Sequence, residues 1–125
     1  MKYIAAFDGG ATPNPGDMII GGFIKKENGQ DVFRFSRSIG KGTNNIAEYS
    51  ALLTLVKEAK RLGIKNLYIQ GDSALIINQV NGVWKAKDPC MKQYKNKVLA
   101  VLKHIENWEL KHVLRKYNSE ADSLT

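Results

Sequence analysis

Four acidic residues lie at widely separated positions of the 125-residue chain, each where the backbone turns or a helix is expected to begin. Asp8 and Asp72 adjoin glycine, Glu48 follows a run of polar residues, and Asp122 lies near the end of the sequence. Carboxylate oxygens are hard ligands that favour Mg²⁺ or Mn²⁺, ions that retain water and accept substrate phosphate oxygens. If the four side chains meet, they predict a metal site for a phosphate-bearing substrate.

Each acid also has an ordinary structural explanation. Asp8 can be a turn residue, and Asp72 can cap the short helix that follows it. Glu48 and Asp122 can favour the positive end of a helix. Four like charges at one edge of a small domain nevertheless repel one another or take up protons. No Lys or Arg adjoins Asp8, Glu48 or Asp72 in sequence, so a divalent cation is the natural partner.

The elements that position these acids begin with three predicted antiparallel strands. Residues 2–7 are short and apolar, and Asp8-Gly9-Gly10 predicts a turn after them. Residues 18–26 predict a second strand, and Asn28-Gly29 is typical of a hairpin. Residues 31–39 then alternate between apolar and polar, which indicates a half-exposed strand. The opening third is therefore expected to be a meander.

A long helix is expected next, because apolar residues recur at three- and four-residue steps from Ile46 to Leu62. Thr43 or Asn44 can cap its start, Gly63 ends it, and Glu48 is expected in its first turn. The later pattern predicts a strand over 66–70, a brief helix over 74–80, a helix begun by Asp88-Pro89 and striped as far as residue 105, a strand over 108–114, and a helical segment from 118.

The connection through the long helix predicts where the acids meet. A crossover helix makes the strand that it feeds parallel to an existing strand. The open position lies beside the first strand, so residues 67–69 are expected to run parallel to residues 3–7. Parallel neighbours end at the same edge, which brings Asp8 and Asp72 together at a switch point of the sheet. Glu48 and Asp122 join them if the long helix and the terminal segment begin at that edge.

The net charge of +7 is unevenly distributed. Six lysines and a single acid lie between Trp84 and His104, with Tyr94 among them. Lysines with interleaved aromatic residues are typical of a nucleic-acid groove, because cations neutralise phosphates and rings stack on bases. A solvated helix face that only aids solubility explains the same pattern. The acids expected at the sheet edge favour the first interpretation.

The motifs around the acids resemble those of type 1 ribonuclease H. In the family's order and at about its spacing they are Asp8-Gly9-Gly10 with Asn14-Pro15-Gly16, Thr43-Asn44-Asn45-x-x-Glu48, Gly71-Asp72-Ser73 and Asn118-x-x-Ala121-Asp122. The resemblance covers nearly the whole chain. It implies an α/β (α+β) ribonuclease H-like fold, a five-stranded mixed sheet in the order 3-2-1-4-5 with flanking helices.

The resemblance also implies an activity and a set of site residues. The activity is metal-dependent endonucleolytic hydrolysis of the RNA strand of RNA–DNA hybrids, leaving 5′-phosphate and 3′-hydroxyl ends. Two Mg²⁺ ions, with Mn²⁺ as an alternative, would be held by Asp8, Glu48, Asp72 and Asp122. Glu48 would also lie near a ribose 2′-hydroxyl, the group that separates RNA from DNA. The implied substrate contacts are Gly9, Gly10, Asn14, Thr43, Asn44, Asn45, Ser73 and Trp84.

Three features depart from the family's pattern. The loop before Asp122 lacks the usual histidine; Arg115 is the expected catalytic substitute, and His112 is the alternative, although it is expected inside the last strand. Ala74 stands where many members have a polar residue, so one base contact is expected to be missing. The family continues with a helix after the fourth acid, so residues 1–125 are expected to be a single ribonuclease H domain truncated at its C-terminal helix.

Length and composition limit the remaining possibilities. The chain fits one domain, and its single cysteine, Cys90, excludes an internal disulfide. Its longest near-apolar stretch, residues 18–24, is too short to cross a bilayer. We therefore expect a soluble, cytoplasmic monomer that binds no membrane. Two other functions remain open: a DNA-cutting or strand-transfer enzyme of the integrase type, and a hybrid- or duplex-binding module without turnover.

Overall fold

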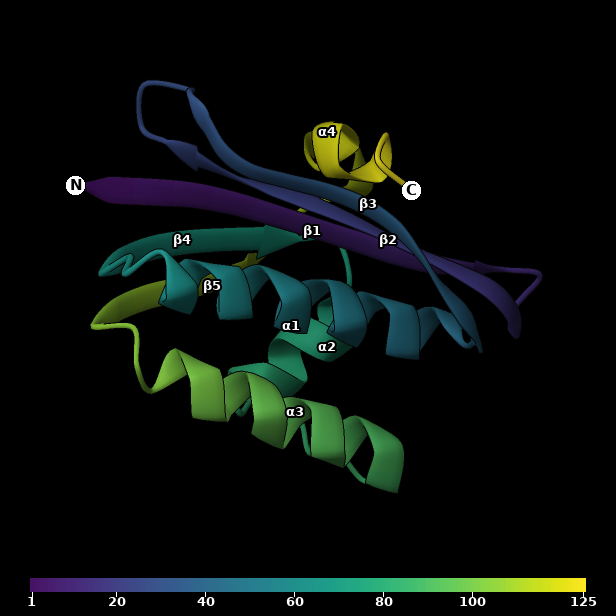
Figure 1. The fold of residues 1–125 in the computed structure, drawn as a ribbon. Coiled ribbons are helices and arrows are strands. Elements are labelled where there is room, and N and C mark those ends of the chain that lie inside the picture. The colour runs from purple at the N-terminus through teal and green to yellow at the C-terminus, as the bar shows by residue number, and fades with distance from the viewer.

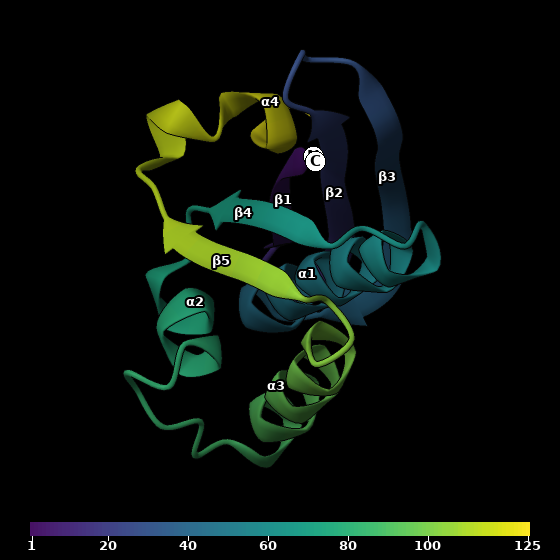
Figure 2. The ribbon, with the colours of Figure 1, turned by 90° about the vertical axis from the view of Figure 1, so that its left-hand side faces the viewer.

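The computed structural model describes residues 1–125 as a mixed sheet with helices on both faces (Figure 1). The five strands lie in the order β3-β2-β1-β4-β5, which confirms the expected topology. Helices α1, α2 and α3 lie on one face, and the short α4 lies on the other (Figures 1 and 2). The elements are β1 (Lys2–Thr12), β2 (Gly16–Lys26), β3 (Asp31–Gly42), α1 (Asn44–Arg61), β4 (Asn66–Gly71), α2 (Ala74–Val80), α3 (Pro89–Leu102), β5 (Asn107–His112), the 3₁₀ helix η1 (Arg115–Tyr117) and α4 (Ser119–Asp122).

β1 continues beyond Asp8, so the predicted turn at residues 8–10 is wrong. β2 pairs with β1 in antiparallel register as far as Thr12↔Asp17. β4 pairs with β1 in parallel only as far as Ala6↔Gln70. The antiparallel ladder therefore holds Gly9 and Gly10 in an extended conformation despite their low strand propensity. Asp8 consequently lies where β1 is paired on one side and open on the other.

The crossover through α1 makes β4 parallel to β1, as the sequence predicts. The register runs from Lys2↔Asn66 to Ala6↔Gln70, and β5 adds a further parallel strand beside β4 (Figure 2). Both β1 and β4 therefore point their carboxyl ends at the same edge of the sheet. This edge of the sheet lies where β4 ends, close to the N-terminal end of α1.

α1 begins at an N-cap that the sequence left open between two residues. The side chain of Thr43 accepts a hydrogen bond from the backbone N–H of Ile46, so Thr43 is the cap. The chain leaves the helix through Gly63, whose positive φ of +72° suits glycine. Because the helix already begins at Asn44 and a turn takes 3.6 residues, Glu48 lies in the second turn; the expectation of the first turn is wrong.

The core lies between the sheet and α1. Fully buried side chains come from both layers: Phe7 on β1, Ile69 on β4, and Leu52, Leu55 and Val56 on α1. Burying such a side chain contributes about 1.5–3 kcal/mol relative to leaving it exposed. This packing fixes the position of α1 against β1, and hence the position of any polar residue that α1 carries at its first two turns.

The C-terminal half follows the predicted order with shifted boundaries. Asp88 caps α3 by accepting a hydrogen bond from the backbone N–H of Met91 at 3.0 Å, as expected. α3 ends at Leu102, and Ile105 is buried in the turn that follows rather than on the helix. β5 ends at His112, before the predicted Leu114, and η1 then leads into α4. None of the helices is both long and apolar enough to cross a membrane.

Candidate active site

Three carboxylates from three different elements meet at the carboxyl edge of the sheet. The nearest ligand atoms of Asp8, Glu48 and Asp72 all lie within 4.8 Å of one another. Asp8 is on β1 just past its last pair with β4, Asp72 is the first residue after β4, and Glu48 projects from α1. The prediction that these three side chains meet is confirmed. Asp8 and Glu48 are only 4% and 7% exposed.

Gly9 allows α1 to approach β1 closely enough for this meeting. A Cβ atom built on Gly9 would lie 2.5 Å from the carbonyl carbon of Ala47 and 2.8 Å from the nitrogen of Glu48. These are backbone atoms, which no rotation of a side chain can move away. Glycine after Asp8 therefore sets the distance between the carboxylates of β1 and α1.

The three acids lie in a cavity of about 300 Å³ that no hydrophobic residue lines. Asp122, at the end of α4, belongs to this lining and raises the pKa of Asp8, but it is not among the three acids whose ligand atoms lie within 4.8 Å of one another. Every lining residue except Thr125 is one that the sequence predicts. Three predicted contacts, Asn14, Thr43 and Trp84, do not line the cavity. The lining is Asp8, Gly9, Gly10, Asn44, Asn45, Glu48, Asp72, Ser73, Arg115, Asp122 and Thr125.

Burial and crowding raise the pKa of two of the acids. The pKa of Asp8 rises from 3.8 to about 7, because its side chain is desolvated, contacts Asp122 and faces the charge of Asp72. The pKa of Glu48 rises from 4.5 to about 9, mainly through burial and then through the charges of Asp8 and Asp72. In the protein alone the charged forms are therefore disfavoured, and a cation placed among them would reverse this preference.

The donor set fits a hard divalent cation. Glu48 Oε1 and Asp72 Oδ2 are buried and accept no hydrogen bond from the protein. Asp72 Oδ2 has an ion-pair partner in Arg115, whose Nε lies 3.5 Å away, whereas Glu48 has none. Buried carboxylate oxygens without a donor are costly unless a positive charge reaches them. All the converging ligands are carboxylate oxygens, the kind that Mg²⁺ and Mn²⁺ prefer. The geometry therefore suits metal binding better than any of the ordinary structural roles considered for the single acids.

Arg115 supplies a positive charge that the sequence does not place beside Asp72. Its Nε lies 3.5 Å from Asp72 Oδ2, and its side chain is 78% exposed. The guanidinium therefore reaches the site from η1 while most of it remains in solvent. His112, the alternative, is the exposed last residue of β5 and does not line the cavity.

The asparagines that lead into α1 join the site to the β1–β2 turn. Asn44 Oδ1 accepts a hydrogen bond from the backbone N–H of Ala11 at 2.7 Å. Asn14 Oδ1 accepts one from the backbone N–H of Asn44 at 3.1 Å. These bonds use the side-chain oxygens of Asn44 and Asn14 within the protein. Ser73 likewise caps α2 by accepting from the N–H of Ile76 at 3.5 Å.

The basic segment lies away from the cavity. Trp84 is 48% exposed in the connection between α2 and α3. The lysines at 85, 87, 92, 97 and 103 are exposed along this connection and α3, including its C-cap, and Lys95 is half-buried. α3 packs on α1 through Val98 and Leu102, so the segment is attached to the element that carries Glu48. It is therefore a second, basic surface separate from the acidic one.

Two residues at the C-terminal end shape the site, and only one of them belongs to a motif of the sequence. Thr125 Oγ1 lies 3.0 Å from Asp8 Oδ2 and 2.9 Å from the backbone oxygen of Asp122. Asn118, 1% exposed, donates a hydrogen bond to the carbonyl of Phe7 at 3.0 Å. Asn118 belongs to the motif quoted above, but neither periodicity nor spacing indicates that it contacts β1. Thr125 carries no local pattern at all.

Fold and site together define the class of ribonuclease H-like proteins. Residues 6–125 match the family model described as reverse transcriptase-like. The chain superposes on ribonuclease H1 from Halobacterium salinarum with a TM-score of 0.94 and 32% identity, over 99% of this chain and 94% of that one. LC11-RNase H1, isolated from compost, gives a TM-score of 0.91 and 36% identity over 98% and 91%. The chain therefore belongs to the ribonuclease H1 family, and the resemblance indicated by the motifs is confirmed.

Curated relatives of the chain are longer than the chain itself. Ribonuclease HI of Halobacterium salinarum is 33% identical over 96% of this chain but only 60% of its own length. The bifunctional protein Rv2228c of Mycobacterium tuberculosis is 31% identical over 99% of this chain and 34% of its own length. The N-terminal RNase H domain of Rv2228c superposes with a TM-score of 0.95. The chain thus spans about 60% of the length of the first of these relatives and about a third of the length of the second.

Proposed function

We propose that this chain is a metal-dependent endonuclease that hydrolyses the RNA strand of RNA–DNA hybrids to 5′-phosphate and 3′-hydroxyl ends. The observation that carries the proposal is the meeting of Asp8, Glu48 and Asp72 within 4.8 Å, with two buried oxygens lacking a donor. The hybrid is the preferred substrate because LC11-RNase H1, 35% identical with a TM-score of 0.90, has been crystallised in complex with an RNA/DNA hybrid.

The proposed ligands are Asp8, Glu48, Asp72 and Asp122, which would hold two Mg²⁺ ions, with Mn²⁺ as an alternative. When bound, such ions supply Lewis-acid stabilisation of the attacking and leaving oxygens of an in-line displacement. The chain's own part is to hold the carboxylates in fixed positions. The backbone does this in two ways. The parallel pairing of β1 with β4 ends just before Asp8 and Asp72, and Gly9 allows α1 to approach β1 closely.

Other residues of the cavity are proposed to bind and orient the hybrid. Gly9, Gly10, Asn45 and Ser73 line the cavity, so backbone and polar groups face a phosphodiester there. The side-chain Nδ2 of Asn44 remains available to the substrate, because Ala11 uses only the side-chain oxygen Oδ1. Arg115, exposed and 3.5 Å from Asp72, is proposed to act as a mobile cation near the phosphate. Asn14, Thr43 and Trp84 lie outside the cavity, and we propose that they contact the hybrid farther from the scissile bond.

The experiment uses labelled RNA–DNA hybrid, duplex DNA and duplex RNA, each with Mg²⁺ or Mn²⁺. Cleavage of the hybrid alone, lost in Asp72→Asn and retained in Glu106→Gln, supports the proposal. Glu106 is a matched control because it is exposed and the change removes the same charge. Cleavage of duplex DNA would instead indicate an integrase-type activity. Hybrid binding without cleavage would indicate a binding module.

Two expectations remain predictions of their own. A monomeric state predicts a mass of about 14.0 kDa by light scattering at micromolar concentration. A cytoplasmic location predicts recovery of the protein in the soluble fraction of its own cells after lysis. A dimer mass or a membrane-bound fraction would contradict them.

A further inference from the structure

α4 carries Asp122 but is too short to hold its own position. It spans four residues, Ser119–Asp122. Isolated helices of this length do not form in water, because nucleation costs more than so few hydrogen bonds return. The place of Asp122 relative to Asp8 is therefore decided by the contacts that attach α4 to the sheet.

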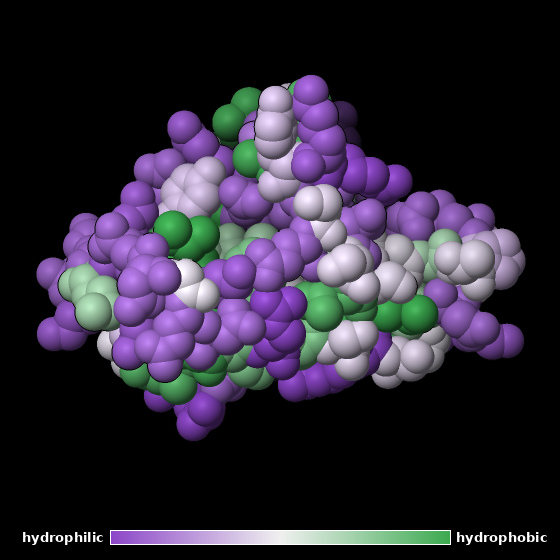
Figure 3. Space-filling view, turned by 90° about the horizontal axis from the view of Figure 1, so that it is seen from above, coloured by the Kyte–Doolittle hydropathy of each residue, from purple (hydrophilic) through white to green (hydrophobic).

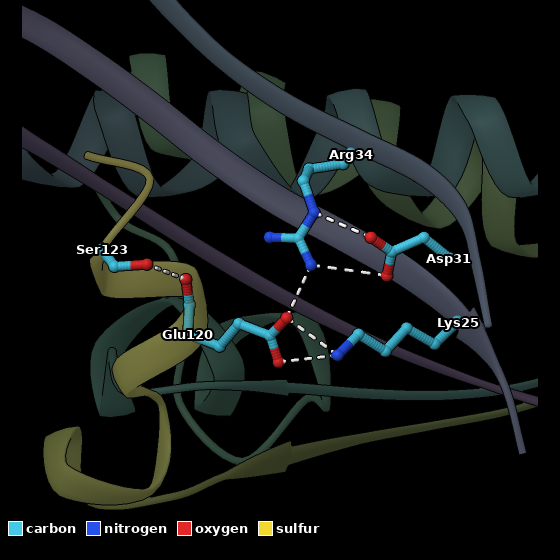
Figure 4. A network of polar contacts seen from close by, with 5 residues as sticks. All are labelled: Lys25, Asp31, Arg34, Glu120 and Ser123. Atoms are coloured by element: carbon cyan, nitrogen blue, oxygen red, sulfur yellow. Dashed lines mark hydrogen bonds and ion pairs between the residues drawn. The ribbon is translucent and has the colours of Figure 1, made fainter. Parts of the chain in front are cut away.

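The polar attachment is an ion-pair network centred on Glu120 (Figure 4). Its carboxylate oxygens lie 2.8 Å from Lys25 Nζ on β2 and 2.5 Å from Arg34 Nη2 on β3. Arg34 is itself held by Asp31, with Nε 2.9 Å from Oδ2 and Nη2 3.3 Å from Oδ1. Two cations and two carboxylates therefore balance in charge. A network of several ion pairs restricts the motion of its side chains more than a lone surface ion pair does.

The apolar attachment lies directly beside the network. Ala121 packs on Ala6 and Phe23, and the cations of Lys25 and Arg34 lie over the Phe23 ring at 4.8 and 5.4 Å. Leu124 approaches β2 so closely that a Cβ on Gly21 would lie 2.6 Å from its own Cβ. This face of the molecule is otherwise largely hydrophilic, with small separate apolar areas (Figure 3).

Asp122 thus lies between Glu120, which is fixed to β2 and β3, and Leu124, whose carbonyl accepts a hydrogen bond from Ser36. We propose that Glu120 is a positioning residue: its ion pairs with Lys25 and Arg34 hold α4 so that Asp122 reaches the carboxylate cluster. The inference rests on the proposed function for its catalytic consequence only. Glu120 does not line the cavity, so it acts through Asp122 and not on the substrate.

The first experiment compares Glu120→Gln with the wild type in steady-state cleavage of the hybrid. We expect kcat to fall about 10-fold, because a misplacement near 1 Å can cost about 100-fold. KM for the hybrid should change by less than about twofold, since no substrate contact is removed. The matched control is Glu58→Gln, which breaks an ion pair with Arg61 on α1 outside the cavity and should leave kcat and KM unchanged.

The second experiment reads the position of Asp122 without any cleavage. Mn²⁺ binding is measured at constant ionic strength from the electron paramagnetic resonance signal of free Mn²⁺. We expect Glu120→Gln to raise the Mn²⁺ concentration at half-saturation about threefold. This is less than the 10–100-fold loss of metal affinity that removing a residue which supports a ligand can cause. Arg34→Gln should reproduce the shift, because it breaks the same contact from the other side. In an Asp122→Asn background Glu120→Gln should cause no further shift. Hydrogen exchange should be faster at the amides of residues 122–124 in the single variant.

The outcomes separate this inference from the proposed function. If the wild type does not cleave hybrids, the proposed function fails, while the Mn²⁺ shift and its dependence on Asp122 still decide the positioning role. If Glu120→Gln matches the wild type in kcat and in Mn²⁺ binding, the positioning role is overturned. An equal Mn²⁺ shift with and without the Asp122 carboxylate also overturns it, since Glu120 would then act by another route.

Discussion

The buried amide of Asn118 makes a strong prediction about stability. Its Nδ2 donates to the carbonyl of Phe7 at 3.0 Å, across 111 positions of sequence, and the residue is 1% exposed. Asn118→Ala removes the donor and leaves a buried carbonyl unpaired, which costs about 1–3 kcal/mol. At about 2.1 cal/mol/K of unfolding entropy per residue, 2 kcal/mol in 125 residues lowers Tm by about 8 °C.

A matched control for this prediction lies at the opposite end of the sheet. Asn107 Nδ2 donates to Asn66 Oδ1 at 2.9 Å, but this pair is exposed, so water can replace it. Asn107→Ala should therefore change the free energy of unfolding by less than about 0.5 kcal/mol. Urea titrations of both variants give the two values at constant slope m. Equal losses in the two variants would refute the reasoning, because burial would then not decide the cost.

Three further predictions concern the site and its charges. With metal chelated, the free energy of unfolding should fall as pH rises from about 4 through about 7 and on to about 9. The reason is that folding raises the pKa of Asp8 to about 7 and that of Glu48 to about 9, so the folded chain binds protons more tightly than the unfolded chain. Urea titrations that show constant or rising stability over this range would contradict the prediction, and added Mg²⁺ should make the fall smaller. Arg115→Ala should lower kcat about 10-fold with Tm unchanged, since the side chain is 78% exposed, whereas His112→Ala should leave both unchanged; the reverse ranking in single-turnover cleavage would make His112 the functional cation. The lysines of α3 to be changed to alanine are Lys92, Lys95 and Lys97. Each change should reduce the slope of log affinity for the hybrid against log salt concentration by about 1 if that lysine contacts a phosphate. An unchanged slope would mean that this face of α3 is only a solvated surface.

Local patterns in the sequence are sufficient for most of the elements. The apolar stripe that begins at Ile46, with a cap at Thr43 or Asn44 and glycine at position 63, predicts α1 within two residues of its observed ends. Helix caps and apolar periodicity depend on residues three or four positions apart, so a single chain displays them directly. The parallel pairing of β1 with β4 follows from the crossover rule, which also predicts that Asp8 and Asp72 share an edge.

Boundaries set by long-range pairing are not predictable in this way. β1 runs on to Thr12 because β2 offers it hydrogen bonds, although two glycines follow Asp8. Glu48 approaches Asp8 because Gly9 allows two backbones to come close. Neither effect changes the local pattern of residue types, so a turn at residues 8–10 is the natural but wrong reading of that segment.

The sequence by itself therefore determined which acids are available and that two of them lie at the same edge of two parallel strands, because residue types and crossover geometry are local and topological properties. Only the tertiary structure decided how the site is completed and charged. It brings Arg115 to Asp72, Thr125 to Asp8, and Glu120 to two cations 86 and 95 positions away. Such contacts depend on where separate elements pack, and their free energy comes from burial and charge that exist only once the chain is folded.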